Sequence, residues 1–510
     1  MNISNRTVRV RFAPSPTGAL HIGGIRTALY NYLLAKKQGG IFILRIEDTD
    51  QGRYVAGAEQ YILDSLKWCG IEPTEGPTYG GSFGPYRQSE RKEMYGKYAQ
   101  ELVEKGLAYV AYDTVEDLEK MRQEYSSESN PSPMYNHITR KGMKNSLTMT
   151  AEENEMERQK GTPFVVRMKI DPGMEIAFDD AIRENVVFRS EELDDKILVK
   201  ADGMPTYHFA NVVDDHLMEI SHVIRGEEWL SSTAHHVLLY KYFGWEETMP
   251  IFAHLPLILK PEGSGKLSKR DGAKFGFPVF PLEWDPKDGT ESFVGFRESG
   301  FDPRAVVNFL ALLGWSPGDD RELMDLEEMV DAFSLEKVGK SGARFDFEKA
   351  KWFNQQYIKK TSGEELAGII RSNIPSVYSD EYVASACNSM KERVFTYNEL
   401  YTDAKFFYSD DFEIDEAMVD KKWSPKSEGH LSLLIEYLKE NNFAESKEAE
   451  ENTKAFLQER GIGMGEIFPI LRLALTGTLK GPDLFQTITI LGKTKVIERL
   501  EKLMKRMTAR

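Results

Sequence analysis

Residues 8–24 of the 510-residue chain read VRVRFAPSPTGALHIGG, and this stretch decides the fold. Apolar residues alternate with arginine over residues 8–12, which predicts a strand with one buried face. The prolines and the glycine of residues 13–18 can continue neither a strand nor a helix. Apolar residues then recur every three or four positions over residues 25–33, which predicts an amphipathic helix that ends near Gly39. The stretch therefore opens a β-α-β unit.

The alternation of strands and helices continues on both sides of a polar interruption. Residues 41–46 (IFILRI) form a second apolar strand, as a parallel sheet requires. From residue 109 to residue 202 the pattern changes to short strands and charged connections. Further strands and helices of the two flanking parts are expected at residues 56–68, 89–105, 221–225, 232–242 and 256–259. From about residue 303 the sequence is typical of helices, up to a basic tail at residues 493–510.

These patterns predict an α/β N-terminal half, with a doubly wound, Rossmann-type parallel sheet split by an insertion, followed by an all-α C-terminal half. A chain of this length is too long for one core, so several domains are expected. The α/β domain is predicted in two parts, residues 1–108 and 206–272, with the insertion at residues 109–205 between them. Two helical regions follow, at residues 273–345 and 346–510. An extra segment at residues 281–299 is predicted to be a packed surface loop, and its role stays open.

The composition excludes several classes of protein. With 41% hydrophobic residues and no long apolar run, the chain is predicted to be globular and without membrane contact. Residues 1–6 lack the apolar region of a signal peptide, so we expect a cytoplasmic location. Only Cys69 and Cys387 are present, which excludes a disulfide framework and a cysteine-based zinc site. The net charge of −16 does not exclude a nucleic-acid partner, because such binding needs only a local basic surface.

The first chemical motif is His21-Ile22-Gly23-Gly24, between the first predicted strand and its helix. A helix N-terminus presents unpaired N–H groups and the positive end of a dipole, so it can bind phosphate. Gly23 and Gly24 would let a nucleotide approach the backbone, where a Cβ atom would clash. His21 could donate a hydrogen bond to a phosphate. The alternative is a tight turn with an incidental histidine, but the position between strand and helix favours the phosphate site.

The second motif is the loop GSGKLSKR at residues 263–270. Lys266, Lys269 and Arg270 flank a serine in a glycine-rich loop, which suits a mobile clamp on a triphosphate. The alternative is a solvated basic loop. Both motifs follow a predicted strand, so both can lie at the carboxyl edge where such sheets bind ligands. Their joint occurrence favours a nucleotide site.

The two motifs resemble the two signatures of class I aminoacyl-tRNA synthetases. The surrounding phrases resemble the bacterial type of glutamyl-tRNA synthetase in particular. They are RFAPSPTG (11–18), RIEDTD (45–50), GPYRQSER (84–91) and TYHFANVVDDH (206–216), and the likeness continues through ALTG (474–477) and LGK (491–493). The first signature ends in glycine, as in the glutamyl members of the family. The likeness thus runs nearly from end to end.

The resemblance implies a pocket for glutamate, which carries an ammonium and two carboxylates. Family positions that contact the amino acid match Arg11, Ala13, Ser15, Glu47, Tyr207, Asn211 and Arg225. Arg11, Tyr207 and Arg225 would bind the side-chain carboxylate, since a guanidinium is its natural partner. Glu47 would bind the ammonium. One arginine at a strand end is more often a surface ion pair, but convergence on one sheet edge favours a pocket.

The resemblance also implies the nucleotide site and the reaction. ATP would be bound by His21, Gly23, Gly24, Glu228, Trp229, Lys266, Ser268 and Lys269, and catalysis is assigned to His21, Lys266, Lys269 and Arg270. ATP with Mg²⁺ enters as a substrate and converts L-glutamate to glutamyl-adenylate, from which the 3′-terminal adenosine of tRNA(Glu) takes the amino acid. The insertion would hold the acceptor end, residues 273–345 the stem, and residues 346–510 the anticodon. A monomer is expected.

Some features argue against further ligands. Residues 108–113 (AYVAYD) stand where some family members carry zinc-binding cysteines, so no structural zinc is expected. His235 and His236 are adjacent on a predicted helix and point about 100° apart, so they cannot share one metal ion well. The basic tail is typical of a solvated helix, and an RNA-facing surface there stays open.

One alternative function stays open, a non-discriminating synthetase that also loads glutamate onto tRNA(Gln). A truncated relative that modifies a tRNA base would lack the helical C-terminal half. A small nucleotidyltransferase with a similar first motif would not need 510 residues. An inactive RNA-binding scaffold should have lost His21 or Lys269, and the chain keeps both.

Overall fold

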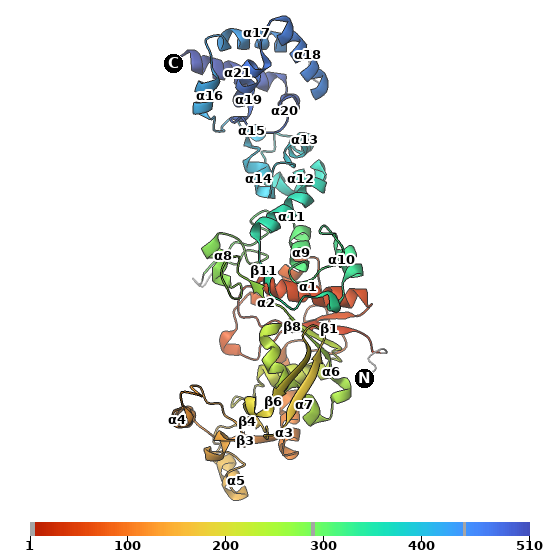
Figure 1. Ribbon diagram of the computed structural model, residues 1–510, viewed down its shortest axis with the longest axis vertical. Helices are drawn as coiled ribbons and strands as arrows, with labels where there is room; N and C mark the ends of the chain where they lie inside the picture. Colours follow the sequence, from red (N-terminus) through yellow and green to blue (C-terminus); the bar gives the residue numbers. More distant parts are fainter. Residues whose placement is uncertain (1–5, 287–290, 442–444, 510) are drawn as a thin grey trace. The chain divides into compact units, whose positions relative to one another are not determined.

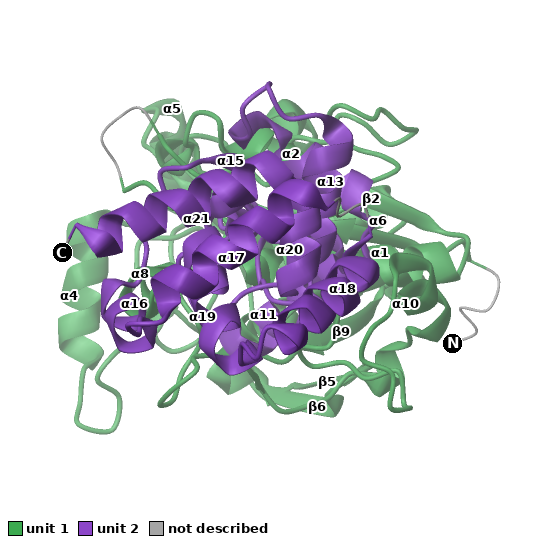
Figure 2. Cartoon of the chain, turned by 90° about the horizontal axis from the view of Figure 1, so that it is seen from above, with its two compact units in different colours: residues 1–296, 307–346 green, residues 297–306, 347–510 purple. Residues whose placement is uncertain are grey.

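The computed structural model describes residues 6–286, 291–441 and 445–509 (Figure 1). The chain divides into two compact units (Figure 2). Unit 1 comprises Met1–Phe296 and Val307–Asp346, and unit 2 comprises Arg297–Val306 and Phe347–Arg510. Among the helices of the described ranges, none combines the length and the apolar character that spanning a membrane requires.

A six-stranded sheet forms the centre of unit 1 (Figure 1). Its strand order is β2-β1-β8-β9-β5-β6, and each neighbouring pair is parallel except the antiparallel pair β5–β6. The strands span Arg9–Phe12 (β1), Ile41–Leu44 (β2), Glu175–Asp180 (β5), Glu184–Arg189 (β6), His222–Gly226 (β8) and Ile251–Leu255 (β9). The predicted α/β class is confirmed, with one antiparallel strand at the edge of a parallel sheet.

Helices connect and cover these strands. The helices that lie wholly in unit 1, outside the insertion, are α1 (Ile22–Lys37), α2 (Ala58–Trp68), α3 (Lys92–Glu104), α6 (Tyr207–Leu217), α7 (Leu230–Phe243), α8 (Lys269–Phe275) and α10 (Leu326–Ala332). Phe209 and Val213 of α6 and Val237 of α7 share one buried core with Val223 of β8 and Phe252 of β9. The N-terminus of α6 lies near the carboxyl end of β8, where Arg225 donates a hydrogen bond to Tyr207, the first residue of α6.

Strand β1 differs from its prediction. All four of its residues are buried, whereas the alternating pattern predicted one buried face. The reason is that its arginines are paired inside the protein. Arg9 donates to both carboxylate oxygens of Glu75, at 3.0 and 2.9 Å, and to the carbonyl of Met218 at 2.8 Å. An arginine with such partners can be buried on the second face of a strand.

The predicted insertion contributes to two sheets. Strands β3 (Ala108–Ala111), β4 (Val165–Met168) and β7 (Ile197–Val199) form a separate antiparallel sheet. Helices α4 (Val115–Tyr125) and α5 (Ala151–Gln159) lie in the same segment, and each begins with a capping box. The β5–β6 hairpin, by contrast, extends the main sheet through β9. The division of the chain into five segments stays a prediction.

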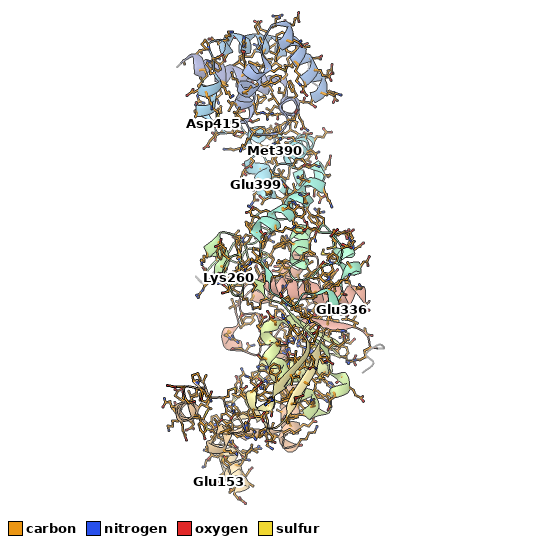
Figure 3. All side chains as sticks on the ribbon, in the orientation of Figure 1. Glu153, Lys260, Glu336, Met390, Glu399 and Asp415 are labelled. Carbon is orange, nitrogen blue, oxygen red and sulfur yellow. The ribbon has the colours of Figure 1, made fainter. Side chains whose placement is uncertain are left out.

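Unit 2 is built from helices, as predicted for the C-terminal half. Helix α9 (Pro303–Ala311) begins in unit 2 and ends in unit 1. The others are α11 (Phe347–Lys360), α12 (Gly363–Ile370), α13 (Asp380–Met390), α14 (Tyr397–Thr402), α15 (Lys405–Tyr408), α16 (Glu416–Lys422), α17 (Ser427–Glu440), α18 (Ser446–Glu459), α19 (Met464–Thr476), α20 (Leu484–Leu491) and α21 (Lys493–Thr508). They share one core, which includes Met390 (Figure 3).

Helix α21 carries the basic tail, and one of its cations is structural. Arg499 is buried, pairs with Asp410 at 3.0 Å and donates to the carbonyls of Leu475 and Phe406 at 2.7 Å each. It is therefore neither solvated nor available to RNA, in contrast to both interpretations of the tail. Arg510 lies outside the described residues.

Candidate active site

A cavity of about 670 Å³ in unit 1 brings the predicted site residues together. Its walls come from the end of β1 and the turn after it, the start of α1, the segment after β2, the start of α6, the end of β8 and the loop before α8. The predicted residues that line it are Arg11, Ala13, Ser15, His21, Gly23, Gly24, Glu47, Tyr207, Asn211, Arg225, Glu228, Trp229, Lys266, Ser268 and Lys269. Arg270, which is predicted to be catalytic, does not line it.

The first signature forms the N-terminus of α1. His21 is the N-cap residue, and its Nδ1 accepts a hydrogen bond from the backbone N–H of Gly23 at 3.1 Å. An acceptor Nδ1 places the ring proton of a neutral imidazole on Nε2. Nε2 is buried and has no hydrogen-bond partner among the described residues. The histidine thus holds an unused N–H donor at a helix N-terminus, where an anion is favoured.

The charge state of His21 follows from its surroundings. Burial, followed by the positive charges of Lys266 and Lys269, lowers the pKa of His21 to about 4. The ring is therefore neutral at pH 7. A Cβ atom at Gly24 would lie 2.5 Å from the end of the Leu20 side chain, so a larger residue there would require Leu20 to move.

The second signature does not follow a strand of the main sheet. It follows β10 (Ile258–Leu259), which pairs with β11 (Ala343–Arg344) in a separate two-stranded sheet. The prediction that both motifs follow strands of one sheet is therefore wrong for this motif. The reason is that β10 finds its partner far along the chain, in a pairing that local sequence does not specify.

Internal contacts hold the second signature loop in place. Ser268 is the N-cap residue of α8, and its hydroxyl donates to Asp271 at 2.6 Å. Lys260, which is labelled in Figure 3, also pairs with Asp271, at 3.2 Å. Lys266 pairs with Glu228 at 2.5 Å, so two predicted ATP-binding residues bind each other. Arg270 is exposed on the first turn of α8.

The two signatures meet at Phe280. This buried ring and the His21 ring are nearly perpendicular, with centroids 6.0 Å apart, and the Nζ atom of Lys269 lies 5.8 Å from the centroid of the Phe280 ring. Burial lowers the pKa of Lys269, and in the described part of the chain no carboxylate pairs with it. A cation without a counter-ion beside a buried N–H donor is suited to a phosphate.

Phe280 adjoins the extra segment at residues 281–299, of which residues 287–290 lie outside the described ranges. The backbones of Trp284 and Phe293 exchange hydrogen bonds of 2.9 and 2.8 Å. The Phe293 ring lies against Phe280, with centroids 4.7 Å apart, and Trp284 lies against Tyr61 of α2. Trp284 and Phe293 of this segment therefore pack against α2 and against the Phe280 ring at which the two signatures meet.

The amino-acid part of the cavity wall rests on a buried network of charges. Arg11 donates to both carboxylate oxygens of Asp215, at 3.0 and 3.2 Å. Arg45 donates to Asp215 at 2.7 Å and to Glu47 at 3.1 Å. Asn211 also donates to Glu47, at 3.0 Å. Both hydrogen bonds of Glu47 reach Oε1, and burial raises the pKa of this carboxyl group.

Arg225 is the residue before the last of β8 and lines the same cavity. Its guanidinium donates to the Tyr207 hydroxyl at 3.1 Å and to the Thr233 hydroxyl at 2.7 Å. The Tyr207 ring lies against Trp229, with centroids 4.4 Å apart. The neighbouring His235 and His236 face different partners, the backbone carbonyl of Asp194 and the side chain of His208.

The residues that support the site were not assigned roles from the sequence. Asp214 accepts from Arg91 at 2.7 Å, from Tyr95 at 2.8 Å and from Gln88 at 2.9 Å, all buried. Gln88, Arg91, Asp214 and Asp215 stand in phrases that carry the family resemblance, so a signal existed. Arg45, wholly buried, also stands in such a phrase.

Comparison with known proteins agrees with this geometry. Residues 7–352 match the family model of the class I tRNA synthetases (E and Q), catalytic domain, and residues 348–504 match an anticodon binding domain. A glutamate–tRNA ligase from Amoebophilus asiaticus is 51% identical over 97% of each chain. One from Porphyromonas gingivalis is 51% identical over 98% of each chain.

A solved structure gives the same result. The chain resembles the crystal structure of a glutamate tRNA ligase from Elizabethkingia meningosepticum in complex with its amino acid, with a TM-score of 0.93 and 47% identity. The match covers 98% of this chain and 99% of the other. The chain therefore belongs to the glutamate–tRNA ligase family of class I tRNA synthetases, as its two signatures predict.

Proposed function

We propose that the chain activates L-glutamate with Mg-ATP and transfers it to the 3′-terminal adenosine of tRNA(Glu). The observation that carries the proposal is that His21 and Lys269 line the same cavity as Arg11, Glu47 and Arg225. The nucleotide site and the carboxylate site are thus parts of one cavity. Their adjacency is what joining an amino acid to a nucleotide requires.

In the first step the α-carboxylate of glutamate attacks the α-phosphorus of ATP. A P–O bond forms, the bond to the leaving phosphate breaks, and pyrophosphate departs. His21 Nε2–H and Lys269 would stabilise the charge that develops on the phosphates. Lys266 would join them once the nucleotide competes with Glu228 for its ammonium group. Ser268 and Glu228 would bind around the nucleotide, with Trp229 beside the adenosine.

The side chain of glutamate would lie on the opposite wall. Arg225, Tyr207 and Arg11 would bind its carboxylate, and Glu47 would accept from the ammonium. Glu47 Oε2 has no hydrogen-bond partner among the described residues, so an oxygen remains for that contact. Ala13, Ser15 and Asn211 would complete the pocket. Arg270 has no role in this proposal, because it is exposed outside the cavity.

In the second step the 2′-hydroxyl of the terminal adenosine attacks the carbonyl carbon of the adenylate. An ester C–O bond forms, the C–O bond to the phosphate breaks, and AMP leaves together with the hydroxyl proton. Catalysis is mainly positioning and charge stabilisation, without a covalent enzyme intermediate. Mg²⁺ enters with the phosphates of ATP, which suits its preference for oxygen ligands and retained water. Within residues 6–286, 291–441 and 445–509 no cluster of three His, Cys, Asp or Glu side chains is placed to hold a metal.

The deciding experiment is aminoacylation of purified tRNA(Glu) and of purified tRNA(Gln), each with glutamate and with glutamine. We expect glutamate on tRNA(Glu). Glutamate on both tRNAs would reveal a non-discriminating enzyme. The absence of glutamate on either tRNA would overturn the proposal.

A further inference from the structure

Every hydrogen-bond partner of the Arg225 guanidinium is uncharged. Its Nε donates to His254 Nε2 at 3.1 Å. The terminal nitrogens donate to Tyr207 Oη at 3.1 Å, His236 Nδ1 at 3.3 Å, Thr233 Oγ1 at 2.7 Å and the Trp229 carbonyl at 3.4 Å. Among the residues that the structure describes, no carboxylate lies within 4.0 Å of this arginine. Because arginine stays charged when buried, its positive charge is left for an anion that enters the cavity.

The contact with His254 fixes the proton of that imidazole. The Nε–H of arginine can only donate, so His254 Nε2 must accept and the ring proton must reside on Nδ1. Nδ1 lies 2.6 Å from Asp180 Oδ2, which accepts the proton's hydrogen bond. Burial lowers the pKa of His254, in agreement with a neutral ring.

Asp180 is itself held rigidly. Its Oδ1 accepts from the backbone N–H groups of Ile182 at 2.9 Å, Arg183 at 2.8 Å and His254 at 3.3 Å. Asp180 and His254 are buried, with 3% and 0% of their surface exposed. Asp180 ends β5, His254 lies on β9 and Arg225 lies on β8, which are neighbouring strands. Arg225 and His254 are register partners, so the pairing of β8 with β9 places these two residues next to each other.

We propose that Asp180 and His254 are positioning residues that orient Arg225 and keep its charge available, so that the site selects a carboxylate over a carboxamide side chain. The inference rests on the proposed binding of the glutamate side chain by Arg225. It also gives the β5–β6 hairpin a part in specificity, although that hairpin lies within the predicted insertion.

The imidazole between the two charged groups is essential to this arrangement. A carboxylate in direct contact with Arg225 would offset its charge and occupy donors that the carboxylate of the substrate needs, as Asp215 occupies two nitrogens of Arg11. Through the ring, Asp180 sets the direction of the guanidinium without contacting it. His236 repeats the pattern, because its Nδ1 accepts from Arg225 and its Nε2 therefore carries the proton toward His208 Nδ1, 3.3 Å away.

Asp180→Asn tests the inference with little change in volume. The amide of asparagine can donate to His254 Nδ1, which would move the ring proton to Nε2. The Nε2–H group would then face the Nε–H group of Arg225, and neither could accept. Loss of a hydrogen bond to a charged group predicts that KM for glutamate rises about tenfold to 100-fold. KM for ATP should stay within about twofold. The ¹⁵N spectrum of labelled histidines should show the change of tautomer, which a merely structural role would not produce.

Asp179→Asn is the matched control, since Asp179 is the preceding residue of β5 and is exposed. It should leave both KM values and the histidine spectrum unchanged. An unchanged KM for glutamate in Asp180→Asn would overturn the inference. A parallel rise of both KM values with a lower melting temperature would overturn it as well, because the role would then be structural.

A second pair of variants covers the case in which Asp180→Asn does not fold. His254→Gln can still accept from Arg225, whereas His254→Leu cannot. We expect the Gln variant to keep a KM for glutamate closer to the wild type than the Leu variant does, and equal values would overturn the inference. Failure of the wild-type chain to use glutamate at all would instead overturn the proposed function.

Discussion

The two walls of the cavity are held by different means. On the amino-acid wall, Arg11, Arg45 and Asp215 have side chains that are at most 3% exposed and are joined by paired hydrogen bonds. On the nucleotide wall, the ion pair of Lys266 and Glu228 has side chains that are 54% and 40% exposed. The first wall is anchored to the main sheet, and the second is partly a loop beside a two-stranded sheet.

This difference between the walls indicates that the amino-acid wall selects the ligand and that the nucleotide wall governs the rate of the reaction. A wall of buried, paired charges is preorganised, so a ligand that mismatches it leaves a buried group unpaired. A loop held by exposed contacts can exchange those contacts for phosphates and release them again, because solvent screens each pair. Mutations should therefore affect stability on the first wall and turnover on the second.

The largest expected effect is on stability, from Asp215→Asn. The substitution leaves Arg11 and Arg45 without their shared carboxylate in the interior. Removal of one partner of a buried pair typically costs about 3–5 kcal/mol, so the unfolding free energy of unit 1 in urea should fall by that amount. Glu228→Gln, which breaks the exposed pair with Lys266, should change it by less than about 1 kcal/mol. Equal losses in the two variants would contradict the contrast between the walls.

The next effect is on turnover, from Lys269→Ala. The lysine lies beside Phe280 and His21 without a carboxylate partner in the described residues, so we expect its charge to act on the reacting phosphates. The rate of glutamate activation, measured by pyrophosphate exchange with tRNA present, should fall about 100-fold to 1,000-fold. The melting temperature should not change. Lys274→Ala, on the same helix and exposed, is the control, and a near-normal rate in Lys269→Ala would remove its assigned role.

Local patterns predicted the parts of the fold that local chemistry determines. The periodicity of residues 25–33 found α1, and the prolines and glycine before it placed the turn that lines the cavity. The signatures placed His21 and Lys269 at one site, because their residue types and their positions beside strands both indicate phosphate binding. The family resemblance supplied the amino-acid wall, which the residues alone suggested only through Arg11, Glu47 and Arg225.

Long-range pairings could not be predicted in the same way. Arg11 was assigned to a half-exposed strand, yet it is buried against Asp215, 204 positions later. Asp180 meets His254 across 74 positions. A strand pattern shows which residues alternate, whereas it does not show which distant carboxylate will neutralise a buried arginine. The pairing of β10 with β11 was missed for the same reason.

A smaller effect concerns acid and the first signature. The pKa of His21 is lowered to about 4, while an unfolded histidine titrates near its ordinary value of 6.5. Between these pH values the unfolded chain binds a proton that the folded chain does not. The contribution of His21 to the free energy of unfolding is therefore fully present above pH 6.5 and is lost as the pH drops from 6.5 to 4. His21→Asn, which can still cap α1, should lose about 2 kcal/mol less than the wild type between pH 7 and pH 5, since each pH unit between the two pKa values is worth about 1.4 kcal/mol. An equal loss in urea denaturation would contradict the neutral, buried state of His21.

The smallest expected effect is that of Arg270→Ala. Arg270 follows Lys269 in the signature, carries the same charge and is exposed as Lys269 is, but unlike Lys269 it does not line the cavity. Exposed substitutions away from special features change free energies by less than about 0.5 kcal/mol, so kcat should stay within about twofold of the wild type. Arg270→Ala and Lys269→Ala each remove one positive charge from the same turn of α8, so the two variants form a matched pair. A loss above about tenfold in pyrophosphate exchange would mean that the loop closes on ATP and brings Arg270 to the phosphates. The catalytic role that the motif predicts for Arg270 would then hold, and the nucleotide wall would be shown to assemble only on its substrate.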